Sequence, residues 1–181
     1  TIAGRKPNAR ISVTPPDFTG ASGAGQHPAN AAYKFITSFK LTSLNAIPAF
    51  RKEGSWVSVY GITLNSLFTG YAGSVSYQSV TLASALPATG VLWVRLSLVL
   101  YKAASTPGDA VLLNIRGTNF TEHNAFRSMY DASNLAAFEV TVPLDASGTF
   151  EFLCNDFDSF SLATLLGYAE GRYGVSTGIA S

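Results

Sequence analysis

The sequence predicts an all-β sandwich built from many short strands. Apolar and polar residues alternate with a period of two in one run after another. Turn signals rich in Gly, Pro, Asp and Asn separate these runs at fairly even intervals. No stretch longer than about two helical turns has a convincing period of 3.6 residues. The chain has 181 residues, which is enough for one domain with a sizeable core.

The longest apolar run, residues 90–102, organises the rest of the chain. One face of this run is aliphatic and comprises Leu92, Val94, Leu96, Leu98 and Leu100. The other face comprises Val91, Trp93, Arg95, Ser97, Val99 and Tyr101. The β-branched and aromatic content favours a strand over a helix. We expect a central strand that is buried on one face and largely covered on the other, with Trp93 in the core or at an interface.

Eight strands are predicted in total. In chain order they are residues 33–44, 55–65, 71–82, 90–102, 110–116, 135–143, 149–154 and 160–168. Residues 46–54 are expected to form a loop, residues 122–130 a short helix, and residues 145–148 a tight turn.

Eight strands joined by long connections predict a jelly roll, a sandwich of two four-stranded antiparallel sheets. We assign this shell domain to residues 33–181. Residues 1–32 are rich in Gly, Pro, Ala, Ser and Asn, and are expected to form an extended N-terminal arm.

The chain is unusually poor in charge. Charged residues make up 13% of it, against about 25% in a typical domain. One interpretation is that much of the surface contacts another protein. The other is a secreted β-domain whose polar face is built from Ser and Thr. Cys154 is the only cysteine, which excludes an intrachain disulfide and a zinc site of several cysteines. No apolar run reaches the length of about 20 residues that a membrane helix needs, and no membrane partner is expected.

The charges are distributed unevenly along the chain. Residues 1–60 hold seven basic and two acidic residues, and residues 110–181 hold three basic and eight acidic residues. This asymmetry suggests a polyanion near the N-terminus, head-to-tail contact between copies, or a chance distribution. Arg5, Lys6 and Arg10 in the arm are what a sequence-independent contact with RNA requires, although a merely soluble tail would also carry them.

Candidate catalytic groups are few, and we expect no enzyme. The two histidines, His27 and His123, show no metal-ligand spacing. Glu139 and Glu151, on the sixth and seventh predicted strands, are able to approach across a sheet if those strands are neighbours, as a glycosidase requires, and Glu170 is a third candidate. However, the glutamates of both strands alternate with apolar residues, as glutamates on the solvent face of a strand do.

Asp156 and Asp158 form the one candidate metal site. Both lie in the loop Asn155–Asp158, which holds two carboxylates and an amide. Hard oxygen ligands of this kind bind Ca²⁺, and a calcium ion shared with another subunit at an interface is one expectation. A capped turn is the other expectation, and no further cofactor is predicted.

The order of a basic, Gly/Pro-rich arm, eight strands and a short tail resembles the single jelly-roll coat protein of small icosahedral positive-strand RNA viruses of the plant-virus type. The resemblance covers residues 33–170 as architecture. It rests on the runs SWVSVYGITLN, TGYAGSVSYQSVTL and GVLWVRLSLVLYK and on the loop NAFRSMYDASN. The arm is less basic than that of many relatives.

The resemblance implies a viral coat protein that self-assembles into an icosahedral capsid around the RNA genome. Its partners are then other copies of itself and viral RNA, and its location is the virion, assembled in the host cytoplasm. The eight predicted strands would be strands B to I in order, arranged as sheets B–I–D–G and C–H–E–F, with the arm facing the genome. The alternative is a trimeric jelly-roll head that binds a receptor or glycan, as in viral fibres or phage tips. A jelly-roll glycoside hydrolase is a third interpretation, with Trp56 or Trp93 lining its cleft.

Overall fold

The computed structural model describes residues 26–27, 30–34, 49–87, 91–118 and 120–171. The chain divides into two compact units, one formed by residues 1–36 with 172–181 and the other by residues 37–171. In the first unit, β1 (Gln26–His27) pairs antiparallel with β2 (Asn30–Lys34).

Most of the predicted arm and of the first predicted strand lies outside the described residues. Of residues 1–32, the structure describes only those that belong to β1 and to the start of β2. Of residues 33–44, it describes Tyr33 and Lys34.

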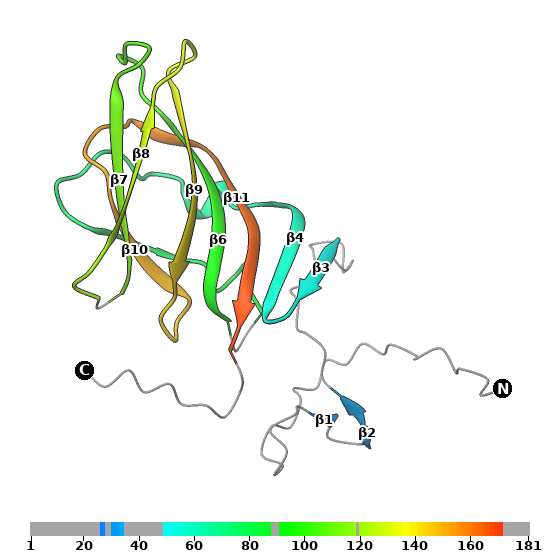
Figure 1. Ribbon diagram of the computed structural model, residues 1–181. Coiled ribbons are helices and arrows are strands. Elements are labelled where there is room, and N and C mark those ends of the chain that lie inside the picture. Colours follow the sequence, from blue (N-terminus) through cyan, green and yellow to red (C-terminus); the bar gives the residue numbers. More distant parts are fainter. Residues whose placement is uncertain (1–25, 28–29, 35–48, 88–90, 119, 172–181) are drawn as a thin grey trace. The chain divides into compact units, whose positions relative to one another are not determined.

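The second unit is a sandwich of two antiparallel sheets, which confirms the predicted all-β class. The five-stranded sheet has the order β3 (Phe50–Glu53), β4 (Trp56–Thr63), β11 (Ser159–Glu170), β6 (Val91–Tyr101) and β9 (Leu135–Pro143). The four-stranded sheet has the order β5 (Gln78–Thr81), β10 (Thr149–Leu153), β7 (Ala110–Gly117) and β8 (Asn124–Met129). Figure 1 shows the two sheets as separate layers, with the 3₁₀ turn η1 (Asn65–Leu67) following β4. No helix in the described ranges is long and apolar enough to cross a membrane.

Strand β6 lies inside the five-stranded sheet, between β11 and β9, as its apolar content predicts. Val94, Leu96, Leu98 and Leu100 are buried on its inner face, and Leu92 emerges at the end of the strand. The prediction that its outer face is largely covered is wrong for the single chain, because Trp93 remains 42% exposed and Tyr101 36% exposed. The interior of the sandwich therefore receives one face of β6, and its other face remains on the surface.

An aromatic cluster fills the core between the sheets. Phe152 makes edge-on contacts with Tyr71 and Phe160, at ring-centroid distances of 5.4 Å each. Phe160 in turn meets Phe68 at 4.8 Å and Phe157 at 5.0 Å. Such edge-to-face pairs add to the stabilisation from burial. The cluster joins residues of the two sheets to the loops at one end of the sandwich.

Three local predictions are wrong, each for a tertiary reason. Residues 124–129 form strand β8 instead of a short helix, because they pair with β7 and place Phe126 opposite Leu113. Strand β3 lies within the predicted loop 46–54, because it pairs with the start of β4. The predicted strand 71–82 shortens to β5, because its first half forms a loop that bonds to residues 154–157.

These differences also change the predicted sheets. Two sheets of four strands were expected, whereas the structure has one of five and one of four. The expected pairing is shifted by one strand. The run 90–102 was expected beside 110–116, but β6 lies between β11 and β9 in the sheet opposite β7. The shift arises because β8 lies between the fifth and sixth predicted strands, where a helix was expected.

The predicted tight turn at residues 145–148 is confirmed. The Gly148 N–H donates to the Asp145 carbonyl at 3.0 Å, and Gly148 has φ +74°, a left-handed conformation that favours glycine. Asp145 Oδ1 accepts hydrogen bonds from the N–H groups of Ser147 and Thr149, each at 2.9 Å. The carboxylate thus holds the turn between β9 and β10.

This turn predicts a pH dependence of stability. Burial by itself would raise the pKa of Asp145, but hydrogen bonds from Ser147 and Thr149 outweigh it and lower the pKa below its ordinary value. A carboxylate with a lowered pKa in the folded state stabilises the protein fully above its unfolded pKa of about 4. That contribution is lost as the pH falls through the folded-state value. We expect Asp145→Asn to lower the free energy of unfolding by about 1 kcal/mol at neutral pH, and by less at pH 3.

Urea denaturation at a series of pH values measures this effect. The exposed Glu122 provides the control, since Glu122→Gln removes a carboxylate of the sandwich that holds no turn. A destabilisation by Asp145→Asn that is equally large at pH 3 and pH 7 would contradict the assigned role of the charge.

Candidate functional site

Four loops of the sandwich meet at one end, and one of them, residues 154–158, contacts the other three. These residues join β10 to β11. The N–H groups of Gly73 and Ser74, from the loop between β4 and β5, donate to the carbonyls of Phe157 at 2.8 Å and Cys154 at 2.9 Å. The approach requires a glycine, because a Cβ at position 73 would lie 2.8 Å from the Asn155 carbonyl oxygen. We call this end of the sandwich the loop end.

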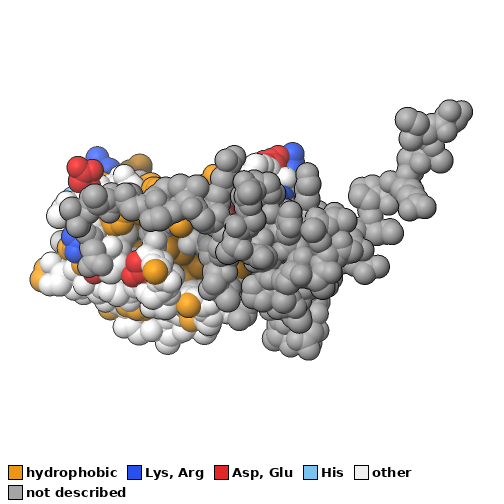
Figure 2. Space-filling view, turned by 90° about the horizontal axis from the view of Figure 1, so that it is seen from below, with side chains coloured by type: hydrophobic (Ala, Val, Ile, Leu, Met, Phe, Trp, Pro, Cys, Tyr) orange, Lys and Arg blue, Asp and Glu red, His pale blue; other side chains and the backbone are white. Residues whose placement is uncertain are grey.

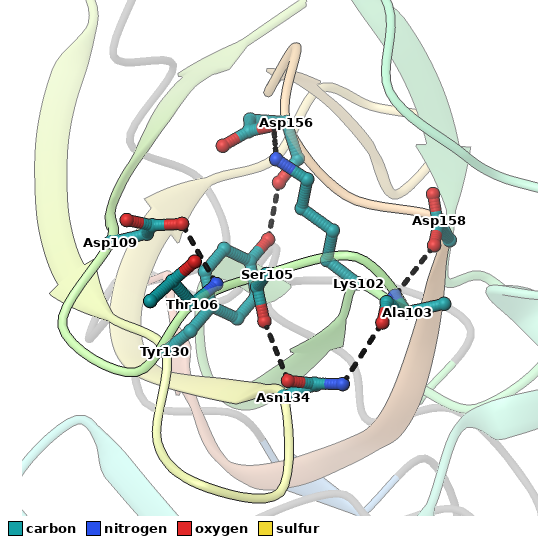
Figure 3. Close-up of polar contacts among 9 residues, drawn as sticks. All are labelled: Lys102, Ala103, Ser105, Thr106, Asp109, Tyr130, Asn134, Asp156 and Asp158. Carbon is teal, nitrogen blue, oxygen red and sulfur yellow. Dashed lines mark hydrogen bonds and ion pairs between the residues drawn. The ribbon is translucent and has the colours of Figure 1, made fainter.

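The loop between β6 and β7 binds the same segment through charged groups (Figure 3). Lys102 Nζ donates to Asp156 Oδ1 in a half-buried ion pair. The Ala103 N–H donates to Asp158 Oδ2 at 2.8 Å. The hydrogen bond to Asp156 raises the pKa of Lys102, and the charges of Asp109 and Asp158 also raise it. The Lys102 ammonium is therefore held positive beside these carboxylates.

Asn134 connects the loop between β8 and β9 to this network. Its Nδ2 donates to the Ala103 carbonyl at 3.1 Å, and its Oδ1 accepts from Ser105 Oγ at 3.0 Å, as Figure 3 shows. Its backbone has φ +61°, and it is the one non-glycine residue with positive φ among those described. Asparagine tolerates this conformation better than most residues. The side chain and the backbone of Asn134 thus both serve the junction of two loops.

Tyr130 connects the network to the protein core. Its ring is buried at 2% exposure, and its hydroxyl donates to the Asp156 carbonyl. Burial raises the pKa of the Tyr130 phenol, and the nearby Cys154 and carboxylates add to this effect. Burial likewise raises the pKa of the Cys154 thiol. Both groups stay protonated at neutral pH, so neither provides a ready nucleophile or base. The network holds four loops in a fixed arrangement.

The two residues predicted to bind calcium, Asp156 and Asp158, both lie in the loop end. Their carboxylates accept hydrogen bonds from Lys102 and Ala103 within the chain. A calcium ion on Asp156 has to displace the Lys102 ammonium or share the carboxylate with it. No cluster of three or more His, Cys, Asp or Glu side chains suited to a metal occurs in the described part of the chain. An interfacial calcium ion therefore remains a prediction that needs ligands from another copy.

Most cations of the sandwich are neutralised within the chain. Residues 49–171 contain six basic and ten acidic residues, a net charge of −4. The ion pairs are Arg51–Glu53, Lys52–Glu170, Arg95–Glu139, Lys102–Asp156 and Arg116–Glu151. Arg127 has no ion-pair partner among the described residues. The sandwich therefore offers little free positive charge to a polyanion.

The outer face of the five-stranded sheet carries a row of apolar side chains. The pairing register places Trp56 on β4 and Trp93 on β6 opposite Ala169 of β11, from its two sides. Pro143 of β9 continues the row beyond Trp93. Ala169 is only 7% exposed, which fits a methyl group between two indoles. We call Trp56, Ala169, Trp93 and Pro143 the tryptophan row.

The predicted RNA-binding residues Arg5, Lys6 and Arg10 lie outside the described residues. Of the two histidines, His27 belongs to β1, and His123 is exposed with its ring centroid 6.4 Å from that of Tyr77.

The glutamates weighed as a glycosidase pair do not approach across a sheet. Glu139 belongs to β9 of the five-stranded sheet and Glu151 to β10 of the four-stranded sheet. Each faces outward between buried neighbours, so the two carboxylates lie on opposite faces of the sandwich. Each carboxylate also pairs with an arginine of a neighbouring strand, Arg95 or Arg116. Glu170, the third candidate, forms a partly buried ion pair of 2.5 Å with Lys52.

No pattern in the sequence identifies Lys102, Tyr130 and Asn134 as members of one network. Local signals existed for Asn134 alone, since the run Asp131–Asn134 before a strand has turn composition. Lys102 and Tyr130 both contact Asp156, which lies more than 20 residues away from each of them in the sequence. No local pattern indicates contacts over such separations.

Outer surfaces of the sandwich mix hydrophobic and polar side chains. Figure 2 shows orange side chains exposed between white ones, with red and blue atoms in small groups. Leu112 and Met129 are exposed on the outer face of the four-stranded sheet.

No protein-family model matches this chain, and no curated protein matches it either.

Proposed function

We propose that this chain is a jelly-roll coat protein that assembles into an icosahedral shell around an RNA genome. The observation that carries the proposal is the strand order. If the strands from β4 to β11 are named B to I, the sheet β4-β11-β6-β9 reads B–I–D–G. The sheet β5-β10-β7-β8 then reads C–H–E–F. This order is the one that the two sheets of a viral jelly roll have, and β3 would be an additional strand beside B.

The surfaces of the sandwich support assembly. Charged residues are few, and five of the six described cations of the sandwich are held in ion pairs. Apolar side chains such as Trp93, Leu112 and Met129 remain exposed on the outer faces of both sheets. A subunit that is surrounded by copies of itself has to desolvate its surface, and neutral or apolar surface makes this less costly.

Contact with RNA is assigned to the arm, because the sandwich is acidic. Residues 1–32 carry three basic residues and one acidic residue, whereas residues 49–171 have a net charge of −4. Arg5, Lys6 and Arg10 then neutralise phosphates without base recognition, and this contact weakens as salt rises.

Sedimentation velocity of the purified full chain, read at 260 and 280 nm, tests the proposal. A species in the megadalton range that absorbs strongly at 260 nm is expected at low salt. Replacing Arg5, Lys6 and Arg10 together by Gln is expected to preserve the folded sandwich and to lower the ratio of absorbance at 260 nm to that at 280 nm. The matched control is Arg127→Gln, which removes an exposed cation from β8 in the four-stranded sheet.

A discrete trimer or monomer with a protein-only spectrum would contradict the coat proposal. Such a result would favour the trimeric binding head, for which glycan binding is the next measurement. An unchanged absorbance ratio in the arm variant, within an intact shell, would show that the arm does not hold the RNA.

A further inference from the structure

Both tryptophans of the chain lie in one short row on the outer face of the five-stranded sheet. Trp56 and Trp93 are the only tryptophans in the sequence. They lie opposite Ala169 from the two neighbouring strands, about 10 Å apart at the usual spacing of strands. Neither indole has a ring contact or a hydrogen bond among the described residues. Packing in the core between the two sheets therefore does not explain why two tryptophans lie on this face.

The surroundings of the row are electrically neutral. Arg51 pairs with Glu53 at 2.5 Å beside Trp56, and Arg95 pairs with Glu139 at 2.5 Å beside Trp93. The adjacent outward row contains these two arginines, and its other members, Ser58, Gly167 and Thr141, are small. A neutral patch with large aromatic side chains and a neighbouring arginine has the composition of a protein–protein hot spot.

We infer that the tryptophan row is a contact surface between two copies of this chain. The occupant is a second copy because the charges favour it. The sandwich as a whole has a net charge of −4, so two copies repel each other over most of their surfaces. On this face Arg51 and Arg95 are each paired with a glutamate, so a second copy that binds here meets no net charge. Each of these exposed ion pairs also presents one positive and one negative group to the second copy. This inference rests on the proposed coat function, and it names the surface that one of the subunit contacts uses.

Intrinsic fluorescence tests the inference without any substitution, because the whole tryptophan signal comes from this row. The full chain is measured above and below the concentration at which sedimentation shows assembly. On assembly we expect the emission to shift to shorter wavelength and quenching by iodide to fall. In Trp56→Phe, the remaining signal from Trp93 should behave in the same way.

Substitutions provide the second readout. Trp93→Ser should raise the protein concentration required for assembly about tenfold or more. The matched control is Val75→Ser, which removes an exposed apolar side chain from the loop between β4 and β5 and should have a much smaller effect on assembly. Circular dichroism should show both variants folded, since both side chains face outward.

The outcomes separate this inference from the proposed function. Assembled particles with unchanged emission and quenching would overturn the inference and leave the coat proposal standing. A chain that never assembles would overturn both. A shift of emission on addition of an oligosaccharide, at constant molecular mass, would replace the second copy by a glycan and overturn the inference as well.

Discussion

Replacing Leu96 by Asp is expected to prevent folding. Leu96 has no exposed surface, and it lies on the inner face of β6 between Leu165 of β11 and Val140 of β9. The substitution removes a packed side chain and leaves an unpaired charge in the core. Its cost is about 5 kcal/mol or more, which is comparable to the whole stability of many domains. Circular dichroism and a thermal melt of the purified variant measure the effect.

Thr141→Asp is the matched control. Thr141 lies in the neighbouring strand and faces outward, opposite Arg95. An aspartate there meets water and a cation, so we expect a folded variant with a stability within about 0.5 kcal/mol of the original. A folded and soluble Leu96→Asp variant would show that the inner face of β6 has been assigned wrongly.

Replacing Tyr130 by Ala is expected to produce the second-largest effect, a loss of about 3–5 kcal/mol in the free energy of unfolding. The substitution empties a buried aromatic site and removes the hydrogen bond to the Asp156 carbonyl. Hydrogen exchange should also quicken in residues 102–109 and 154–158, which the network holds together. Urea denaturation and exchange measured by mass spectrometry give the two readouts.

Two comparisons separate the ring from its hydroxyl. Tyr130→Phe keeps the ring and loses only the hydrogen bond, so about 1 kcal/mol is expected. Tyr60→Ala removes an exposed tyrosine from β4 and should change stability by about 0.5 kcal/mol or less. If Tyr130→Ala were as mild as Tyr60→Ala, the loop end would not depend on this anchor.

Local patterns predicted the elements whose causes are local. The alternation in residues 90–102 predicted which face of β6 is buried, because successive side chains of a strand point to opposite sides. The turn at residues 145–148 was predictable because an Asp and a Gly at these positions satisfy the turn by themselves. For β8 the local pattern was weak, since Phe126 is its one large apolar residue that packs against the core. Pairing with β7 made it a strand.

Three features follow from the amino-acid sequence alone: the all-β class, the buried face of the central strand and the low charge of the surface. These follow from side-chain alternation, turn chemistry and composition, which depend on neighbours in the chain. Tertiary structure decided which strands pair, and therefore that Glu139 and Glu151 lie on opposite faces while Trp56 and Trp93 share one. It also decided that Lys102, Tyr130 and Asn134 meet at one end. Strand order is set by packing between distant segments, and no local pattern contains that information.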